Sequence, residues 1–233
     1  MKLLAIETAT LLGGMAIMDE SEGLIAESRL NVKATYSERL MVEVDHMLKQ
    51  SGLSLDRIDA FAVSVGPGSF TGLRIGLSTV KGFAFVSGRP VISVPTLEAM
   101  AWNLAFSRYP VCTMLDARKK EVYAALFVLE NGEIKRIMCE TSIGAEQLLK
   151  KIQSDAPEQK IVFAGEGALL YEKLITDTIA DRAVFAPPEK MTPSAAAVAA
   201  LGMKKALRGE FSEPIGLVPF YIRRSEAEIK RDG

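Results

Sequence analysis

The chain has 233 residues, of which 48% are apolar and 24% are charged. Its 28 basic and 29 acidic side chains give a formal net charge of −1, which excludes the strongly basic surface of a protein that binds nucleic acid by its own charge. The first apolar run ends at Glu7 and is too short for a signal peptide or a membrane span, so we expect a cytoplasmic protein without a membrane segment.

Three strands are predicted at the N-terminus, the last two joined by the turn-forming run 19–23. Further along, a Gly-Pro-Gly run that starts at Gly66 opens a long apolar helix. The elements expected in this half are strands 2–6, 14–18 and 24–30, helix 37–50, strand 60–65, helix 69–87, strand 90–94 and helix 96–106.

The second half repeats this pattern. Glu7 follows the first strand of one half and Asp116 follows that of the other, and Gly23 and Gly132 come after these acids at the same spacing. The elements expected here are strands 111–115, 122–129 and 133–139, helix 144–153, strand 160–164, helix 168–176, strand 183–186 and helix 193–208.

Each half therefore predicts a βββαβα lobe, and the fold class is α/β, with mixed sheets and helices on both faces. A duplicated lobe with an acid after its first strand is similar to the actin/hexokinase/heat-shock ATPase superfamily, which has a ribonuclease H-like fold. We expect an N-terminal lobe over 1–107 with the partner-binding helices and a C-terminal lobe over 108–191. We expect a final helix and tail over 192–233 that pack back between the lobes.

The glycine-rich segment 66–74 has the sequence Gly-Pro-Gly-Ser-Phe-Thr-Gly-Leu-Arg. It is not a dinucleotide fingerprint, because its third glycine comes one residue late, and it is not a P-loop, because no Gly-Lys-Ser/Thr follows. Two interpretations remain. Free backbone N–H groups at the start of the helix can hold an anion. Alternatively, the glycines only permit a tight turn, and Ser69 or Thr71 caps the helix.

The helix over 69–87 is apolar on all sides, with Gly72 and Gly76 on one face. Since a glycine inside a helix costs about 1 kcal/mol relative to alanine, this pair indicates that another helix approaches closely. The helix's own sheet can cover one side only. Helix 37–50 or a partner protein then covers another side, and complete burial within the same lobe is the alternative.

Few residues could carry chemistry. Glu7 and Asp116 stand where the ATPase superfamily places phosphate- and metal-associated carboxylates. The bend after Asp116 is charged, however, and Asp116, Arg118 and Glu121 could equally form a structural ion-pair cluster. One histidine, His46, and two cysteines make a zinc or iron site hard to build, and there is no nucleophile elbow. We therefore expect no catalytic residue, no metal and no disulfide.

Five segments spread along the chain resemble one known family. They are Leu4-Ala-Ile-Glu-Thr-Ala-Thr10, Gly66-Pro-Gly-Ser-Phe-Thr-Gly-Leu-Arg-Ile-Gly76, Val94-Pro-Thr-Leu-Glu98, Leu115-Asp-Ala-Arg-Lys-Lys-Glu-Val-Tyr123 and Pro219-Phe-Tyr-Ile-Arg223. The family is TsaB (formerly YeaZ), the bacterial accessory paralogue of the threonylcarbamoyl transferase TsaD. The resemblance implies a non-catalytic subunit that works with TsaD and the ATPase TsaE. Together they form threonylcarbamoyladenosine beside the anticodon of tRNAs that read codons beginning with A.

Family members pair with TsaD, and often with themselves, through helices of the first lobe. In this sequence, the partner-binding residues implied are Tyr36, Leu40, Gly72, Leu73, Gly76 and Val80. A vestigial nucleotide site would comprise Glu7, Thr8, Gly66, Gly68 and Asp116. No intrinsic cofactor is expected, although ATP or ADP could lie at the interface of the complex, and tRNA is reached through the complex. The competing hypotheses are a small-molecule kinase or ATPase of the same fold and, with too few metal ligands, a metalloprotease.

Overall fold

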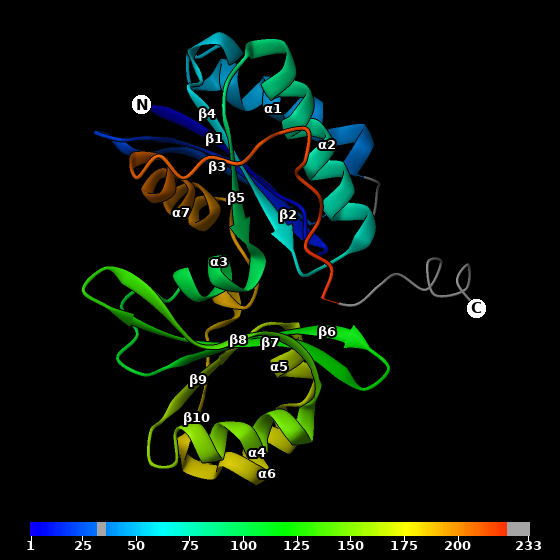
Figure 1. Cartoon of the computed structure of the whole chain (residues 1–233), viewed down its shortest axis with the longest axis vertical. Helices are drawn as coiled ribbons and strands as arrows, with labels where there is room; N and C mark the ends of the chain where they lie inside the picture. Colours follow the sequence, from blue (N-terminus) through cyan, green and yellow to red (C-terminus); the bar gives the residue numbers. More distant parts are fainter. Residues whose placement is uncertain (32–35, 223–233) are drawn as a thin grey trace. The chain divides into compact units, whose positions relative to one another are not determined.

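The computed structural model describes residues 1–31 and 36–222, without the side chains of residues 30, 31 and 36–38. The chain divides into two compact units (Figure 1). The first contains Met1–Ala99 and Pro193–Phe220, and the second contains Met100–Thr192 together with Tyr221 and Ile222. The division therefore lies after residue 99, where the sequence suggested 107, and the helix of the 192–233 segment belongs to the first unit.

The first unit is built on a five-stranded sheet of order β3-β2-β1-β4-β5. Its strands are β1 (Lys2–Glu7), β2 (Leu12–Asp19), β3 (Gly23–Asn31), β4 (Ala60–Gly66) and β5 (Val91–Pro95). The first three strands form an antiparallel meander, while β4 and β5 run parallel to β1. Every residue of β4 is buried, as expected for a parallel strand that is covered on both faces.

Helices cover both faces of this sheet. Helices α1 (Tyr36–Gln50) and α2 (Phe70–Ser87) lie on one face, where Leu4 and Ile6 of β1 join their core, and α7 (Ala195–Leu207) lies on the other (Figure 1). The backbone of α7 comes so close that a Cβ added to Gly202 would lie 2.7 Å from the Cβ of Ala62 and 3.4 Å from Leu3. Successive residues of β1 thus face opposite helix layers, which follows from the two-residue period of a strand.

The second unit has a sheet of order β10-β9-β6-β7-β8. Its strands are β6 (Val111–Arg118), β7 (Glu121–Glu130), β8 (Glu133–Gly144), β9 (Ile161–Ala164) and β10 (Ala183–Phe185). β6, β7 and β8 are antiparallel, and β9 and β10 run parallel to β6. Taken from the β8 edge, this order and these directions repeat those of the first sheet, so the predicted duplication is confirmed.

The remaining helices are short. They are α3 (Thr96–Trp102), α4 (Ala145–Asp155), α5 (Glu166–Leu170), α6 (Glu172–Ile179) and the 3-10 turns η1 (Leu55–Arg57), η2 (Ala180–Arg182) and η3 (Pro188–Lys190). The prediction of a single helix over 168–176 is wrong in one respect, because Tyr171 separates α5 from α6. At Tyr171, φ is −109° and ψ is 20°, outside the helical range, so α6 starts in a new direction.

Candidate functional site

The acid at the end of β1 lies in a dry environment. Glu7 is fully buried, its Oε1 accepts a 2.7 Å hydrogen bond from the backbone N–H of Ala9, and its Oε2 has no hydrogen-bond partner. Burial raises the pKa of Glu7 to about 8, although the Ala9 N–H, the nearby Ser64 hydroxyl and the charge of Arg29 each lower it in part. The Ser64 hydroxyl makes no hydrogen bond of good geometry. At neutral pH the carboxyl is therefore mostly protonated, unlike a carboxylate that supports a metal.

Glycines of α2 permit close contact with the bend that follows β1. The hydroxyl of Thr8 donates a 2.8 Å hydrogen bond to the carbonyl oxygen of Gly72. A Cβ at Gly72 would overlap the carbonyl oxygen of Thr8, and a Cβ at Gly76 would overlap the Thr8 hydroxyl. The close approach that these glycines predicted is thus real, but the element that approaches is the β1–β2 bend of the same unit and not another helix.

Two backbone N–H groups at the start of α2 make hydrogen bonds within the first unit. The N–H of Ser69 donates to the carbonyl oxygen of Ala9 at 2.7 Å, and the Ser69 side chain accepts from the N–H of Gly72 at 3.3 Å. A Cβ at Gly68 would lie 2.8 Å from the Cβ of Ala9. The loop therefore caps α2 through Ser69 and packs on the bend, as the interpretation of the glycines as a tight turn with a helix cap predicted.

The C-terminal part of the first unit contacts the end of β4, just before this loop. We call residues 211–220 the strap. The N–H of Phe220 donates a 2.7 Å hydrogen bond to the carbonyl oxygen of Val65, and Ser212 bridges Val91 of β5. Gly66 has a φ of 122°, and a Cβ there would lie 2.6 Å from the carbonyl oxygen of Phe220. Gly66 is thus required for backbone conformation and for close packing of the strap.

The matching bend of the second unit contains an ion pair between Asp116 and Arg118. Asp116 accepts a 2.8 Å hydrogen bond from the N–H of Arg118, and its Oδ2 lies 3.3 Å from the Arg118 guanidinium. Glu121 accepts a 2.8 Å hydrogen bond from the hydroxyl of Ser142. Burial and the negative charge of Asp116 raise the pKa of Glu166, which begins α5. Asp116 thus has local structural partners, in line with the structural alternative.

The residues expected to contact a partner lie inside the first unit. Leu40, Gly72, Leu73, Gly76 and Val80 are all buried against their own sheet or bend. Tyr36 begins α1, and its side chain lies outside the described residues. The sequence pattern did not distinguish the outward face of α2 from its buried face, because α2 is apolar nearly all round.

Other residues of the same helices form the exposed face. On α2, a line at helical spacing consists of Ser78, Gly82 and Phe85, which we call the α2 stripe. Phe85 is 90% exposed, and nothing lies within 4 Å of a Cβ added to Gly82. On α1, Met41 and Val42 are also exposed. The sequence offered no signal for this face, because Gly82 is a helix glycine like the buried Gly72 and Gly76 and only the structure shows that it is open to solvent.

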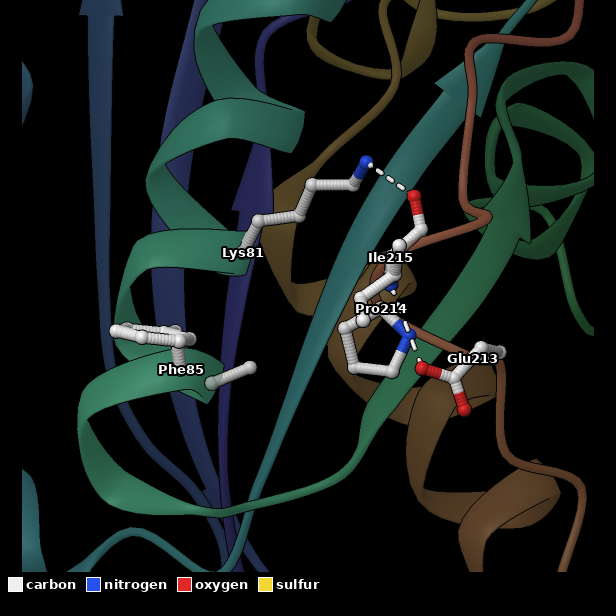
Figure 2. A pocket seen from close by; sticks show the side chains of 6 residues that line it. Lys81, Phe85, Glu213, Pro214 and Ile215 are labelled. Carbon is white, nitrogen blue, oxygen red and sulfur yellow. Dashed lines mark hydrogen bonds between the residues drawn. The ribbon is translucent and has the colours of Figure 1, made fainter.

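A pocket lies between α2 and the strap (Figure 2). It is lined by Lys81, Ala84, Phe85, Glu213, Pro214 and Ile215 and has a volume of about 330 Å³. In Figure 2 the Lys81 side chain reaches across to the strap, where its Nζ donates a 3.2 Å hydrogen bond to the carbonyl oxygen of Ile215. Phe85, which also lines the pocket, belongs to the α2 stripe, so the pocket adjoins the stripe.

The possible metal and redox residues are dispersed. His46 is exposed on α1, and Cys112 and Cys139 are both free, with burial raising the pKa of Cys112. Within residues 1–31 and 36–222, no three His, Cys, Asp or Glu side chains gather closely enough to hold a metal ion. No helix in the same part of the chain combines the length and apolar character needed to cross a membrane.

Comparison with known proteins assigns the family. Residues 25–231 match the TsaD family, described as tRNA N6-adenosine threonylcarbamoyltransferase. The chain is also 32% identical to the tRNA threonylcarbamoyladenosine biosynthesis protein TsaB of Escherichia coli over 241 aligned positions, which cover 100% of this chain and 99% of that protein. The chain belongs to the TsaB family. Its domain is TsaD-like, and the resemblance of the five sequence segments is confirmed.

Solved structures agree with this assignment. The TsaB-family protein YeaZ from Pseudomonas aeruginosa is 27% identical, with a TM-score of 0.79 over 94% of this chain and 99% of that one. The ethanolamine utilization protein EutJ from Carboxydothermus hydrogenoformans has a TM-score of 0.52 at 12% identity, over 87% of this chain and 90% of that one, and shows a shared fold alone. The expected actin/hexokinase-like fold, with two mixed five-stranded sheets, is therefore confirmed for this TsaB-family chain.

Proposed function

We propose that the chain is a non-catalytic partner of a TsaD transferase in forming threonylcarbamoyladenosine on tRNA. The observation that carries the proposal is the relationship to a TsaB protein over the whole chain. The environment of Glu7 supports the non-catalytic part, because a buried, mostly neutral carboxyl neither reaches a ligand nor offers a charge to a metal. TsaE, tRNA and ATP or ADP would join through the complex, in the cytoplasm.

The α2 stripe is the part of the surface that we assign to TsaD. Gly82 lowers helix stability by about 1 kcal/mol relative to alanine, and no group of its own unit packs on it. A helix laid across Ser78 and Gly82 could approach the α2 backbone closely, with Phe85 as the large apolar anchor at one end. The helix stability that Gly82 costs the free chain would then be offset by the close packing of the partner helix in the complex.

The neighbouring surface suits the same partner. Met41 and Val42 of α1 are 53% and 65% exposed, and α1 lies beside α2 on one face of the sheet (Figure 1). Two adjacent helices with apolar outer residues fit a pair of helices on a related lobe, such as the TsaD paralogue offers. The same face would serve a homodimer of the free chain.

The test is size-exclusion chromatography with light scattering, of the chain alone and with its cognate TsaD. We expect a heterocomplex with the native chain and its loss with Gly82→Leu, which fills the open space on the stripe, and with Phe85→Ala. The matched control is Leu207→Ala, which removes an exposed leucine from α7 on the other side of the sheet and should leave pairing unchanged. Unchanged pairing of both stripe variants would assign TsaD to another surface.

The kinase or ATPase hypothesis is tested separately. Magnesium-dependent ATP hydrolysis by the purified chain, lost in a Glu7→Gln variant, would overturn the non-catalytic role. The proposal predicts no hydrolysis above that of a mock purification.

A further inference from the structure

Two hairpins of the second sheet have nearly the same turn with different sequences. The β7–β8 hairpin turns at Asn131 and Gly132, where φ is 54° and 73°, and the β6–β7 hairpin turns at Lys119 and Lys120, where φ is 53° and 64°. Two central residues with positive φ define the tight turn that matches strand twist, and Asn-Gly is its favoured sequence. Lysine has no such advantage, because its Cβ crowds the backbone at positive φ.

The unfavourable conformation extends one residue further. Arg118 also has a positive φ, 63°, so three consecutive cationic residues occupy the left-handed region. All three side chains are exposed. Asp116 holds the turn, because it accepts a hydrogen bond from the N–H of Arg118 and forms an ion pair with the Arg118 guanidinium. Strained backbone of this kind persists where a function outweighs its cost. The Asn131-Gly132 turn shows that this sheet can form the same turn without lysine.

We infer that the turn of Arg118, Lys119 and Lys120 binds phosphate groups of an RNA backbone. The inference rests on the proposed function, which makes tRNA the polyanion at hand. Arginine and lysine side chains contact phosphates without needing a pocket, which suits an exposed hairpin tip better than a nucleotide that requires an enclosing cavity. Because the whole chain has a net charge of −1 and Asp116 and Glu166 lie beside the turn, the positive charge that attracts phosphate is confined to the turn itself.

The test replaces the lysines with the sequence of the sister turn, in the variant Lys119→Asn/Lys120→Gly of the full chain. Because Asn and Gly favour the turn, the melting temperature should rise by about 3 °C. Binding of an unmodified tRNA transcript should weaken by about tenfold at roughly 50 mM salt, and the slope of log K against log salt should fall by about 2, one for each lost phosphate contact.

The matched control is Lys150→Gln/Lys151→Gln, which removes two exposed lysines from α4 of the same unit. It should leave the melting temperature, the affinity for tRNA and the salt slope unchanged. The inference is overturned if the native chain fails to bind tRNA at low salt, or if the turn variant binds as tightly as the native chain. It is also overturned if millimolar ATP displaces the tRNA from the turn, since the ligand would then be a nucleotide. Pairing with TsaD is measured on the same two double variants. If the turn variant pairs normally with TsaD and binds tRNA like the native chain, the phosphate-binding inference is refuted and the proposed function stands.

Discussion

The hydroxyl of Thr8 donates a 2.8 Å hydrogen bond to the carbonyl oxygen of Gly72, which joins the end of β1 to the first turns of α2. This contact requires that α2 have no side chain at Gly72 or Gly76, because a Cβ at either position would overlap Thr8. Two kinds of glycine therefore occur in one helix: those that face the bend and Gly82, which faces open space.

The two kinds should respond oppositely to the same substitution. Gly76→Ala should lower the free energy of unfolding by about 1–3 kcal/mol, because the added methyl group overpacks against Thr8. Gly82→Ala should raise it by about 0.5–1 kcal/mol, because alanine favours the helix and meets no neighbour. Urea unfolding of the two variants measures both effects, and changes of the same sign would contradict the assignment of faces.

Glu7 should make the free energy of unfolding fall between about pH 4.5 and pH 8. Its pKa is raised to about 8 in the folded state from 4.5, so the folded chain retains a proton that the unfolded chain releases, and stability falls as the pH rises from about 4.5 to 8. Glu7→Gln removes this loss. Relative to the native chain, the variant should gain on the order of 3 kcal/mol between pH 5 and pH 8.5.

The measurement is urea unfolding of the native chain and the variant at several pH values, so that other titrating groups cancel in the difference. A flat difference for Glu7→Gln would mean that the carboxyl is already ionised in the folded chain.

Gly66 should hold the strap in place. Gly66→Ala combines an unfavourable φ of 122° with a Cβ 2.6 Å from the carbonyl oxygen of Phe220, so we expect a loss of about 2–4 kcal/mol and faster proteolysis of residues 211–220. Gly209→Ala is the matched control, since its φ is also positive, at 73°, but no atom lies within 4 Å of the added Cβ. It should lose only about 1 kcal/mol. Equal losses would show that the strap contact contributes nothing.

If one face serves both pairings, TsaD should displace the homodimer. Adding TsaD to a homodimer of the chain should convert the homodimer into a heterocomplex, with one copy of TsaD at the α2 stripe of each chain. Light scattering or native mass spectrometry measures this conversion. Gly82→Leu should weaken both pairings together. A variant that loses the homodimer while binding TsaD normally would separate the two surfaces.

Much of the fold was predictable because local signals agreed with one another. The succession of strands and helices along both halves, the acids at the matching bends and the turn at Asn131 all followed from hydrophobic period and turn residues. The break at Tyr171 did not, because the apolar pattern continues through it and no glycine or proline marks it.

The sequence by itself determined which segments are helices and strands, that they are duplicated and to which family the chain belongs. Only the tertiary structure decided which side of α2 faces outward and that Glu7 lies in a dry core. The reason is physical: helical spacing shows which residues share a face, but α2 is apolar on nearly every face. The covered face was settled by packing against Thr8, which lies 64 residues from Gly72 along the chain.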